Sequence, residues 1–350
     1  MKPSLNLPFP SGWFCVATAA DVPSGAVRTV TFMGESRVLF RTASGTLGLV
    51  DAYCPHLGAH MGQGGCVDGE TLRCPFHGFR FAPGGACVGS YHGKPPVKLQ
   101  ARALPVREKH GLLLAWYHPD GRAPDWEVPD LDLAGWTPFL IHRFRLRGHP
   151  QETSENSVDM GHFGAVHGFT ELELLHTGVD GPRLVTDYRF RRFIGKGRLG
   201  FTARTEIHVE VRGLGYSLVD VDVPTLGLRS RHLVLSTPTE RDQLDLRVGV
   251  SVAGARNLRW VGPFLPDFVT GLVARGVMSI YKDDVQQDFA IWENKRYVAR
   301  PIMARGDGPI VLYRKWAAQF YPANGSERRE EDDVRGARAE EPRGADPARA

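Results

Sequence analysis

The chain lacks several features that would place it in common functional classes. It contains no run of about 18 apolar residues, so no transmembrane helix is expected. Its N-terminal stretch is interrupted by Pro8 and Pro10 and is not the apolar segment of a signal peptide. The net charge of +4 is too small to indicate nucleic-acid binding. Five cysteines, an odd number in a chain of this length, argue against a disulfide scaffold and favour a reducing compartment. We expect a cytoplasmic protein, with peripheral membrane contact left open.

What is present suffices for a folded core. Apolar residues make up 42% of the 350 residues, and at roughly 100–200 residues per domain the length predicts two domains. The end of the chain differs in composition, because residues 326–350 contain one large aliphatic side chain, Val334, among many Glu, Asp and Arg. Such a segment cannot bury enough apolar surface to offset its ordering entropy, so we expect a disordered charged tail over residues 323–350.

The first third of the chain reads as β-structure and the remainder as a mixture. Alternating apolar and polar residues predict an early strand at 27–32, apolar segments on either side of the turn 43–46 predict strands at 38–41 and 47–50, and a continuous apolar segment predicts a buried strand at 112–116. A cluster of Pro and Gly over 117–129 then marks a boundary. Later strands are predicted at 141–146, 184–194, 205–211, 216–221, 231–236 and 244–252, with helices over 153–167 and 268–296.

Two Cys and two His form the first chemical motif. Cys54-Pro55-His56 is followed, after 17 residues, by Cys74-Pro75-Phe76-His77. This set could hold a tetrahedral zinc ion or a Rieske [2Fe–2S] cluster, in which two His replace two Cys on one iron. Zinc sites usually space their first two ligands by two to four residues, whereas Cys-x-His has one. Glycines crowd both loops and would let backbone amides approach cluster sulfurs, so the cluster is favoured. The other cysteines, Cys15, Cys66 and Cys87, are expected to be packing residues.

A second motif contains Asp159, His162 and His167. Five residues separate the two His, which is about 140° around a regular helix, so they need a distorted turn to share a ligand. Gly161 and Gly164 supply the backbone freedom for one. Beside a Rieske cluster, the expected electron acceptor is a non-haem Fe(II) held by two His and one carboxylate.

One further motif is rejected on context. Residues 195–200 match the dinucleotide pattern Gly-x-Gly-x-x-Gly, but residues 201–211 alternate as a strand and do not open a helix. No nucleotide-binding reductase is therefore expected within the chain, and electrons must come from a separate ferredoxin or flavin reductase.

These motifs carry a family resemblance. The stretch 13–128, above all the phrase Asp51-Ala52-Tyr53-Cys54-Pro55-His56-Leu57-Gly58-Ala59-His60, resembles the Rieske domain of ring-hydroxylating oxygenases. The spacing Asp-x-x-His-x-x-x-x-His over 159–167 is similar to their mononuclear iron motif. Segments at 291–297, 306–310, 314–316 and 319–322 resemble the steroid branch, which includes 3-ketosteroid 9α-hydroxylase oxygenase components and cholesterol 7-desaturases. The resemblance covers roughly residues 11–322.

The resemblance implies an α+β fold, with an N-terminal all-β Rieske domain (11–118) after an arm (1–10). A helix-grip catalytic domain (119–322), an antiparallel sheet around a long C-terminal helix, would follow. The third iron ligand would be Asp288, four residues before Trp292, with Asp284 as the alternative. Asp159 would bridge His162 and the cluster ligand His77 of a neighbouring subunit in a homotrimer. Asn156 would lie near the iron.

The implied activity is O₂-dependent hydroxylation or desaturation of a hydrophobic polycyclic substrate, most simply a sterol or steroid. A non-steroid aromatic compound or secondary metabolite is the alternative substrate. A Rieske electron-transfer protein without oxygenase activity is the alternative from another class, although some 200 residues beyond the cluster motif would then have no role.

Overall fold

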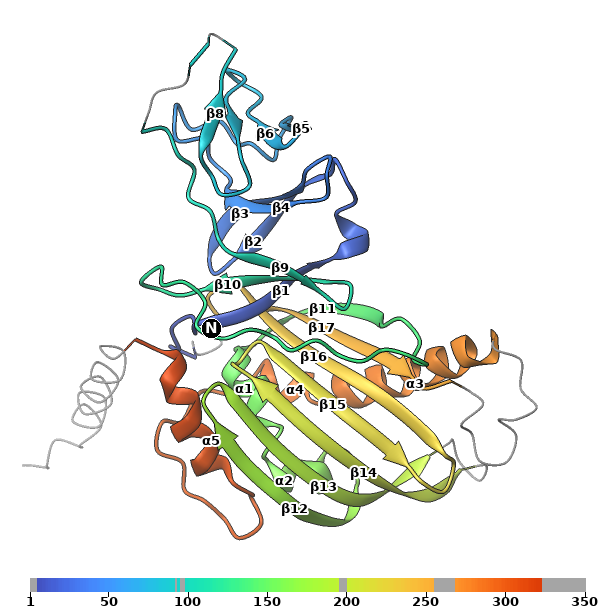
Figure 1. Ribbon diagram of the computed structural model, residues 1–350. Coiled ribbons are helices and arrows are strands. Elements are labelled where there is room, and N and C mark those ends of the chain that lie inside the picture. The colour runs from blue at the N-terminus through green and yellow to red at the C-terminus, as the bar shows by residue number, and fades with distance from the viewer. Residues whose placement is uncertain (1–4, 92, 95–97, 195–199, 255–267, 323–350) are drawn as a thin grey trace, which may run out of the picture.

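The computed structural model describes residues 5–91, 93–94, 98–194, 200–254 and 268–322 (Figure 1). The expected charged tail, 323–350, lies outside the described residues. So do residues 1–4 of the expected arm and residues 195–199 of the Gly-x-Gly-x-x-Gly segment. Residues 201–212, which follow that segment, form a strand as predicted.

The first ten strands form three small antiparallel sheets, ordered β1-β10-β9, β2-β3-β4 and β5-β6-β7-β8. All four predicted early strands are present. Strand β1, which is buried on both faces, and the short strands β5 to β9 are not predicted. The bounds are β1 (Gly12–Thr18), β2 (Val27–Phe32), β3 (Glu35–Arg41), β4 (Leu47–Asp51), β5 (Cys66–Asp68), β6 (Thr71–Arg73), β7 (Arg80–Phe81), β8 (Cys87–Gly89), β9 (Val106–Lys109) and β10 (Leu112–Tyr117), with a 3₁₀ turn η1 (Ala19–Asp21).

The next seven strands form one antiparallel sheet in the order β11-β17-β16-β15-β14-β13-β12. The six later strands predicted from the sequence all lie within it. The seventh, β12, is missed because two register shifts against β13 interrupt its alternation. The bounds are β11 (Leu140–Arg147), β12 (Thr170–Asp180), β13 (Arg183–Ile194), β14 (Phe201–Arg212), β15 (Tyr216–Val223), β16 (Leu228–Glu240) and β17 (Gln243–Val252).

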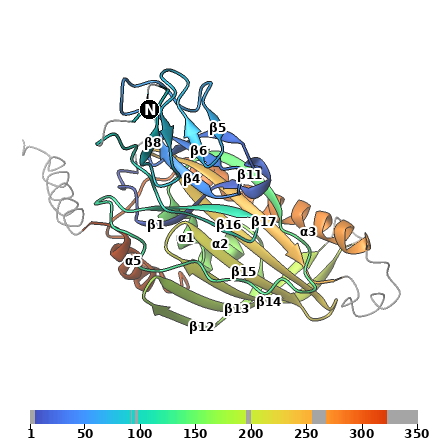
Figure 2. The ribbon, with the colours of Figure 1, turned by 45° about the horizontal axis from the view of Figure 1, so that its top comes forward.

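The helices gather on one face of this sheet (Figures 1 and 2). Apolar side chains of α3 and α4, among them Met278 and Trp292, pack in one cluster with Leu246 and Val248 of β17. The predicted α+β class, an all-β domain followed by an antiparallel sheet around a long helix, is confirmed. The bounds are α1 (Pro150–Glu155), α2 (Met160–Ala165), α3 (Phe268–Gln287), α4 (Phe289–Trp292), α5 (Ile310–Ala317) and a 3₁₀ turn η5 (Ala318–Phe320).

Both predicted helices are interrupted. The window 153–167 contains α1 and α2, because Asp159 adopts an extended conformation and its carboxylate caps the new helix at His162 N, 3.2 Å away. The window 268–296 is divided at Asp288, whose N–H donates to Val285 O at 3.2 Å, one residue short of the α-helical partner. Each interruption lies at a residue that the sequence singled out for its chemistry.

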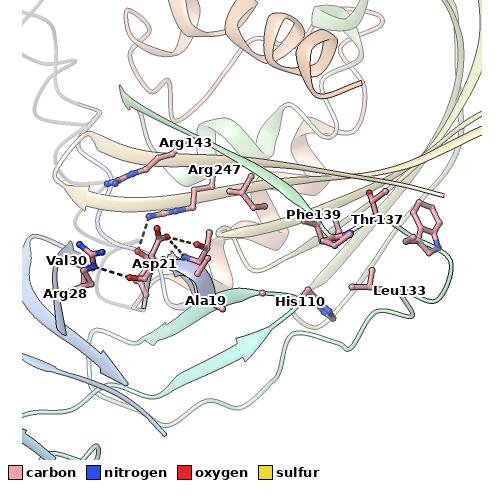
Figure 3. A pocket seen from close by; sticks show the side chains of 18 of the residues that line it. Ala19, Asp21, Arg28, Val30, His110, Leu133, Thr137, Phe139, Arg143 and Arg247 are labelled. Carbon is pink, nitrogen blue, oxygen red and sulfur yellow. Dashed lines mark hydrogen bonds between the residues drawn. The ribbon is translucent and has the colours of Figure 1, made fainter. Parts of the chain in front are cut away.

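The two halves of the molecule share a core. Trp13 and Cys15 of β1 lie in one cluster with Tyr216 and Leu233 of the large sheet. The buried Arg247 guanidinium donates to Cys15 O at 2.7 Å and to Val16 O at 3.0 Å, which fastens β1 to the sheet. A cleft of about 1180 Å³ opens beside this contact, between η1 and β11 (Figure 3). None of the predicted site residues lines it.

Two further expectations concern cysteines and membranes. None of the five cysteines, all of which lie in described segments, forms a disulfide. Cys15 is buried as expected, whereas Cys66 and Cys87 are half-buried. Among the helices that the structure describes, none is long and apolar enough to cross a bilayer.

Candidate metal centres

Two loops of the N-terminal half present Cys54 and Cys74 in the same local structure. Cys54 N–H donates to Ala59 O at 2.8 Å, and Cys74 N–H donates to Phe79 O at 2.8 Å. In each loop the fourth residue after the Cys is a glycine, Gly58 or Gly78, with a φ of 76° or 66°. A side chain at these positions would be strained. Both Cys side chains are buried, and burial raises the pKa of the Cys54 thiol to about 11.

The two His of these loops face one another, with ring centroids of His56 and His77 4.8 Å apart. The ligand atoms of a single tetrahedral zinc would all lie within about 4 Å of one another. In the described part of the chain, only His162, His167 and Asp288 form a group of three metal-binding side chains with ligand atoms within 4.8 Å. The four Cys and His ligand candidates are therefore spread more widely than one zinc ion requires, which fits a two-iron cluster.

The cluster loops stand at an exposed end of the molecule. Leu57 and Phe76, the neighbours of His56 and His77, are 66% and 62% exposed. Strands β5, β6 and β8 flank these loops. In the folded molecule they lie at the opposite end from α2 and β12 (Figure 1). An exposed apolar side chain thus neighbours each of the two His at this end of the molecule.

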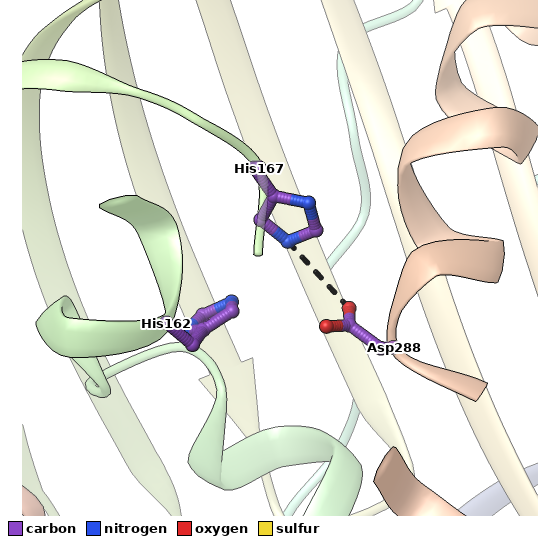
Figure 4. A group of neighbouring side chains, drawn as sticks. All are labelled: His162, His167 and Asp288. Carbon is purple, nitrogen blue, oxygen red and sulfur yellow. Dashed lines mark ion pairs between the residues drawn. The ribbon is translucent and has the colours of Figure 1, made fainter. Parts of the chain in front are cut away.

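The second centre lies between the large sheet and the helices that cover it. His162 comes from α2, His167 from the turn after that helix, and Asp288 from the junction of α3 and α4 (Figure 4). His167 Nε2 is 3.6 Å from Asp288 Oδ2, and ligand atoms of all three lie within 4.8 Å of one another. Because α2 ends at Ala165, the two His do not lie on one continuous helix, where they would be about 140° apart. Both side chains can therefore face the same centre.

Hydrogen bonds orient both imidazoles toward the centre. His162 Nδ1 donates to the carbonyl oxygen of Asp159 at 2.6 Å, which leaves Nε2 with the lone pair. His167 Nδ1 pairs with Gln287 Oε1 at 3.1 Å, which turns Nε2 toward Asp288. Metal-binding His usually has such an outer partner, because it fixes the ring and its tautomer.

Burial shifts the pKa values of His162 and Asp288 in the directions that favour their neutral forms. Burial lowers the pKa of His162 to about 4. It raises the pKa of Asp288 to about 6, against the lowering influence of His167 and of a hydrogen bond with Asn156. His162 is therefore neutral at pH 7, as a metal ligand must be. A divalent cation would supply the positive charge that the buried carboxylate lacks.

The remaining predicted residues have separate positions. Asp284 does not join the group, because its Oδ2 accepts from Arg192 Nη2 at 2.8 Å. Asn156 contacts Asp288. Asp159 caps α2 through its carboxylate and holds His162 through its backbone, so its carboxylate does not bond the His162 ring within the chain.

A cavity of about 180 Å³ opens at the second centre. Its wall combines the three metal-binding side chains with aromatic and branched apolar ones. The apolar lining consists of Phe163, Phe169, Phe190, Ile207, Val209, Val219, Val221, Val234, Val285 and Trp292.

Sequence reasoning missed two features of this site. Gln287, the partner of His167, carries no signal beyond its place beside Asp288. Arg192 could have been found from strand parity, because it shares the inward face of β13 with the buried Tyr188 and Phe190.

Comparison with known proteins confirms the resemblance read from the sequence. Residues 12–100 match the Rieske [2Fe-2S] domain family, and residues 115–321 match the 3-ketosteroid 9alpha-hydroxylase C-terminal domain family. Cholesterol 7-desaturase nvd 1 of Ciona intestinalis is 30% identical, over 90% of this chain and 69% of its own length. A probable 3-ketosteroid-9-alpha-monooxygenase oxygenase component of Rhodococcus rhodochrous is 29% identical, over 89% of this chain and 79% of its own.

Solved structures share the fold. Dicamba monooxygenase bound to dicamba superposes with a TM-score of 0.68 at 20% identity, over 88% of this chain and 96% of that one. NdmA of Pseudomonas putida CBB5 gives 0.66 at 16% identity, over 87% and 88%. The chain belongs to the Rieske non-haem iron oxygenases with a 3-ketosteroid 9α-hydroxylase-type catalytic domain, oxidoreductases that use a Rieske [2Fe–2S] cluster and a mononuclear iron.

Proposed function

We propose that this protein is the oxygenase component of a multi-component system that hydroxylates or desaturates a sterol or steroid with O₂. Cys54, His56, Cys74 and His77 would hold the cluster. His162, His167 and Asp288 would hold Fe(II). The observation that carries the proposal is this last group, two His and one carboxylate whose ligand atoms lie within 4.8 Å of one another at a largely apolar cavity.

The chemistry divides between the metals and the chain. When bound, an iron with two His and one Asp supplies open positions for O₂, and the cluster supplies electrons one at a time. The chain contributes positioning. Asp159 and Gln287 fix the two imidazoles, and the aromatic wall, including Phe163 and Phe169, excludes water from the reacting carbon.

A steroid substrate is supported by the lining and by the relatives. Apart from one polar end with Arg192, Asp284 and His232, the walls away from the metal ligands are mainly hydrocarbon, which suits a rigid apolar ring system. Relatives with desaturase and monooxygenase names cover most of this chain. The cavity of about 180 Å³ is smaller than the roughly 300–1,000 Å³ of typical ligand sites. The lining side chains must therefore move apart to admit a steroid.

The function is tested by incubating the iron-loaded protein with O₂, a ferredoxin, a flavin reductase and a panel of sterols, ketosteroids and non-steroid aromatics. Mass spectrometry should find a steroid product that has gained one oxygen atom or lost two hydrogen atoms. The His162→Ala variant serves as the control and should give neither product. Turnover confined to the non-steroid compounds would refute the steroid assignment and leave the oxygenase assignment intact.

We further propose that electrons pass between subunits of a homotrimer, with domain boundaries at 11–118 and 119–322. The exposed tip with Leu57 and Phe76 supports this, because neighbouring exposed apolar side chains can form a contact surface for another protein chain. The position of this tip, at the opposite end of the molecule from α2, also supports electron transfer between subunits. Within one chain the cluster would lie far from the iron, and a neighbouring subunit can bring its own iron close to that cluster.

Complementation tests the exchange between subunits. Cys74→Ser removes the cluster and His162→Ala removes the iron, so each variant alone should be inactive. Refolded or co-expressed together, they should regain about a quarter of the wild-type activity, because a mixed trimer contains cluster–iron pairs that are both intact. Sedimentation must show a trimer in every sample. A trimer without regained activity would place electron transfer within one chain.

A further inference from the structure

Arg192 is a cation on the inward face of a strand. Its companions on that face of β13 are apolar or uncharged and are buried, namely Leu184, Thr186, Tyr188 and Phe190. Taking a guanidinium out of water is unfavourable unless its N–H groups find partners. The contacts of the Arg192 guanidinium therefore indicate the role of this side chain.

The structure satisfies only part of this guanidinium. Nη2 donates to Asp284 Oδ2 at 2.8 Å, and the guanidinium carbon lies 5.2 Å from the ring centroid of Phe169. Nε is buried and has no hydrogen-bond partner among the described residues. Arg192, Asp284 and Phe169 all line the cavity at the iron site. One N–H of a fixed, charged group is thus left for a molecule in that cavity.

Neighbouring side chains make this end of the cavity polar without adding charge. His232 of β16 contacts Tyr281 of α3, with ring centroids 4.2 Å apart, and His232 Nε2 pairs with Ser230 Oγ at 2.9 Å. Burial, followed by the nearby Arg192 charge, lowers the pKa of His232 to about 3. The imidazole is therefore neutral and does not compete with Arg192 for an anion.

The polar end lies at a defined spacing from the iron ligand. Asp284 and Asp288 are one helical turn apart, and both line the cavity. Four residues correspond to a rise of about 6 Å. A rigid ring system that reaches from Arg192 to the metal ligands would therefore hold its polar atom at a fixed distance from the carbon that faces the metal.

We propose that Arg192, positioned by Asp284, determines specificity by donating a hydrogen bond to an acceptor oxygen of the substrate. A ring carbonyl is the group that fits, because the unsatisfied group is a donor and Asp284 is already paired. The bond selects substrates that carry the oxygen and fixes which carbon faces the iron. This inference rests on the steroid substrate proposed above and assigns its polar end.

A binding cycle tests the inference in the iron-loaded protein. Two steroids that differ only by a ketone or a methylene at C3 are titrated by calorimetry into wild type and Arg192→Met. Wild type should bind the ketone about 10- to 100-fold more tightly, the range for a hydrogen bond to a charged group. Arg192→Met should lose this preference by losing ketone affinity. Arg191→Met is the matched control, since Arg191 is exposed on the opposite face of the same strand, and it should keep the preference.

Two further measurements separate recognition from folding. If Arg192→Met does not fold, Arg192→Met/Asp284→Asn removes both charges of the pair and replaces it in the cycle. Product analysis should show oxidation at more than one carbon in the folded variant. An equal loss of affinity for both steroids would overturn the inference, as would a wild type that binds them equally. A wild type that binds neither would refute the steroid assignment itself.

Discussion

Replacing Asp288 by Asn should reduce the iron content from about three to about two atoms per chain, while the cluster absorbance stays unchanged. The amide removes the one anionic ligand of the buried group, and two neutral His do not neutralise Fe(II). Loss of an outer partner of a metal ligand typically costs about 10- to 100-fold in affinity or activity, so loss of a ligand should cost more. Iron analysis and turnover of the purified variant measure both effects.

The matched control is Asp284→Asn, the same substitution one turn earlier on the same helix. Its carboxylate pairs with Arg192 at 2.8 Å, so this variant should lose some stability and keep about three irons per chain. Iron content is the deciding measurement here, because Asp284 also positions Arg192 beside the substrate. Retention of the third iron in Asp288→Asn together with its loss in Asp284→Asn would reverse the ligand assignment.

Asp159→Asn should leave cluster and iron in place and lower turnover by about 100-fold, the upper range for an outer partner of a metal ligand. Asn caps a helix about as well as Asp, so α2 and the backbone bond to His162 Nδ1 should persist. In the proposed homotrimer, the variant loses the negative charge that the Asp159 carboxylate would offer to His77 of a neighbouring subunit. Stopped-flow measurement should show normal cluster reduction by the reductase and slow reoxidation in the presence of substrate and O₂.

Asp159→Ala distinguishes this bridge from the cap. This variant loses both the negative charge of the carboxylate and the N-cap of α2. The lost cap alone costs about 1 kcal/mol of stability. The melting temperature of Asp159→Ala should therefore fall, whereas that of Asp159→Asn should not. Wild-type reoxidation in Asp159→Asn would remove Asp159 from the electron path, whatever the stability of the alanine variant.

How far the sequence predicts this molecule depends on how local each feature is. The Cys54 and Cys74 loops are readable because each contains its own Cys, His and positive-φ glycine within five residues. Asp288 and Asp284 look alike in sequence, since they lie on adjacent turns of one helix. What separates them is Arg192, which is 92 residues from Asp284 in the chain. No local pattern carries that information.

The fold follows the same rule. Most strands are predicted because alternation is a property of one strand and its two faces. Strand β12 is missed because its register shifts depend on its pairing with β13. The interruption at Asp159 was visible only as a capable N-cap residue inside an otherwise helical window, and its extended conformation decides between one helix and two.

The pairing of His167 with Gln287 across 120 residues has a consequence for how the protein matures. Long sequence separations slow folding, because the intervening chain must be ordered before the contact forms. The iron site cannot exist until α3 docks against the completed sheet. A metal that binds only the docked state shifts the folding equilibrium toward it in proportion to its free concentration. We therefore expect free iron to favour the docked state of α3 and the complete assembly of the catalytic domain.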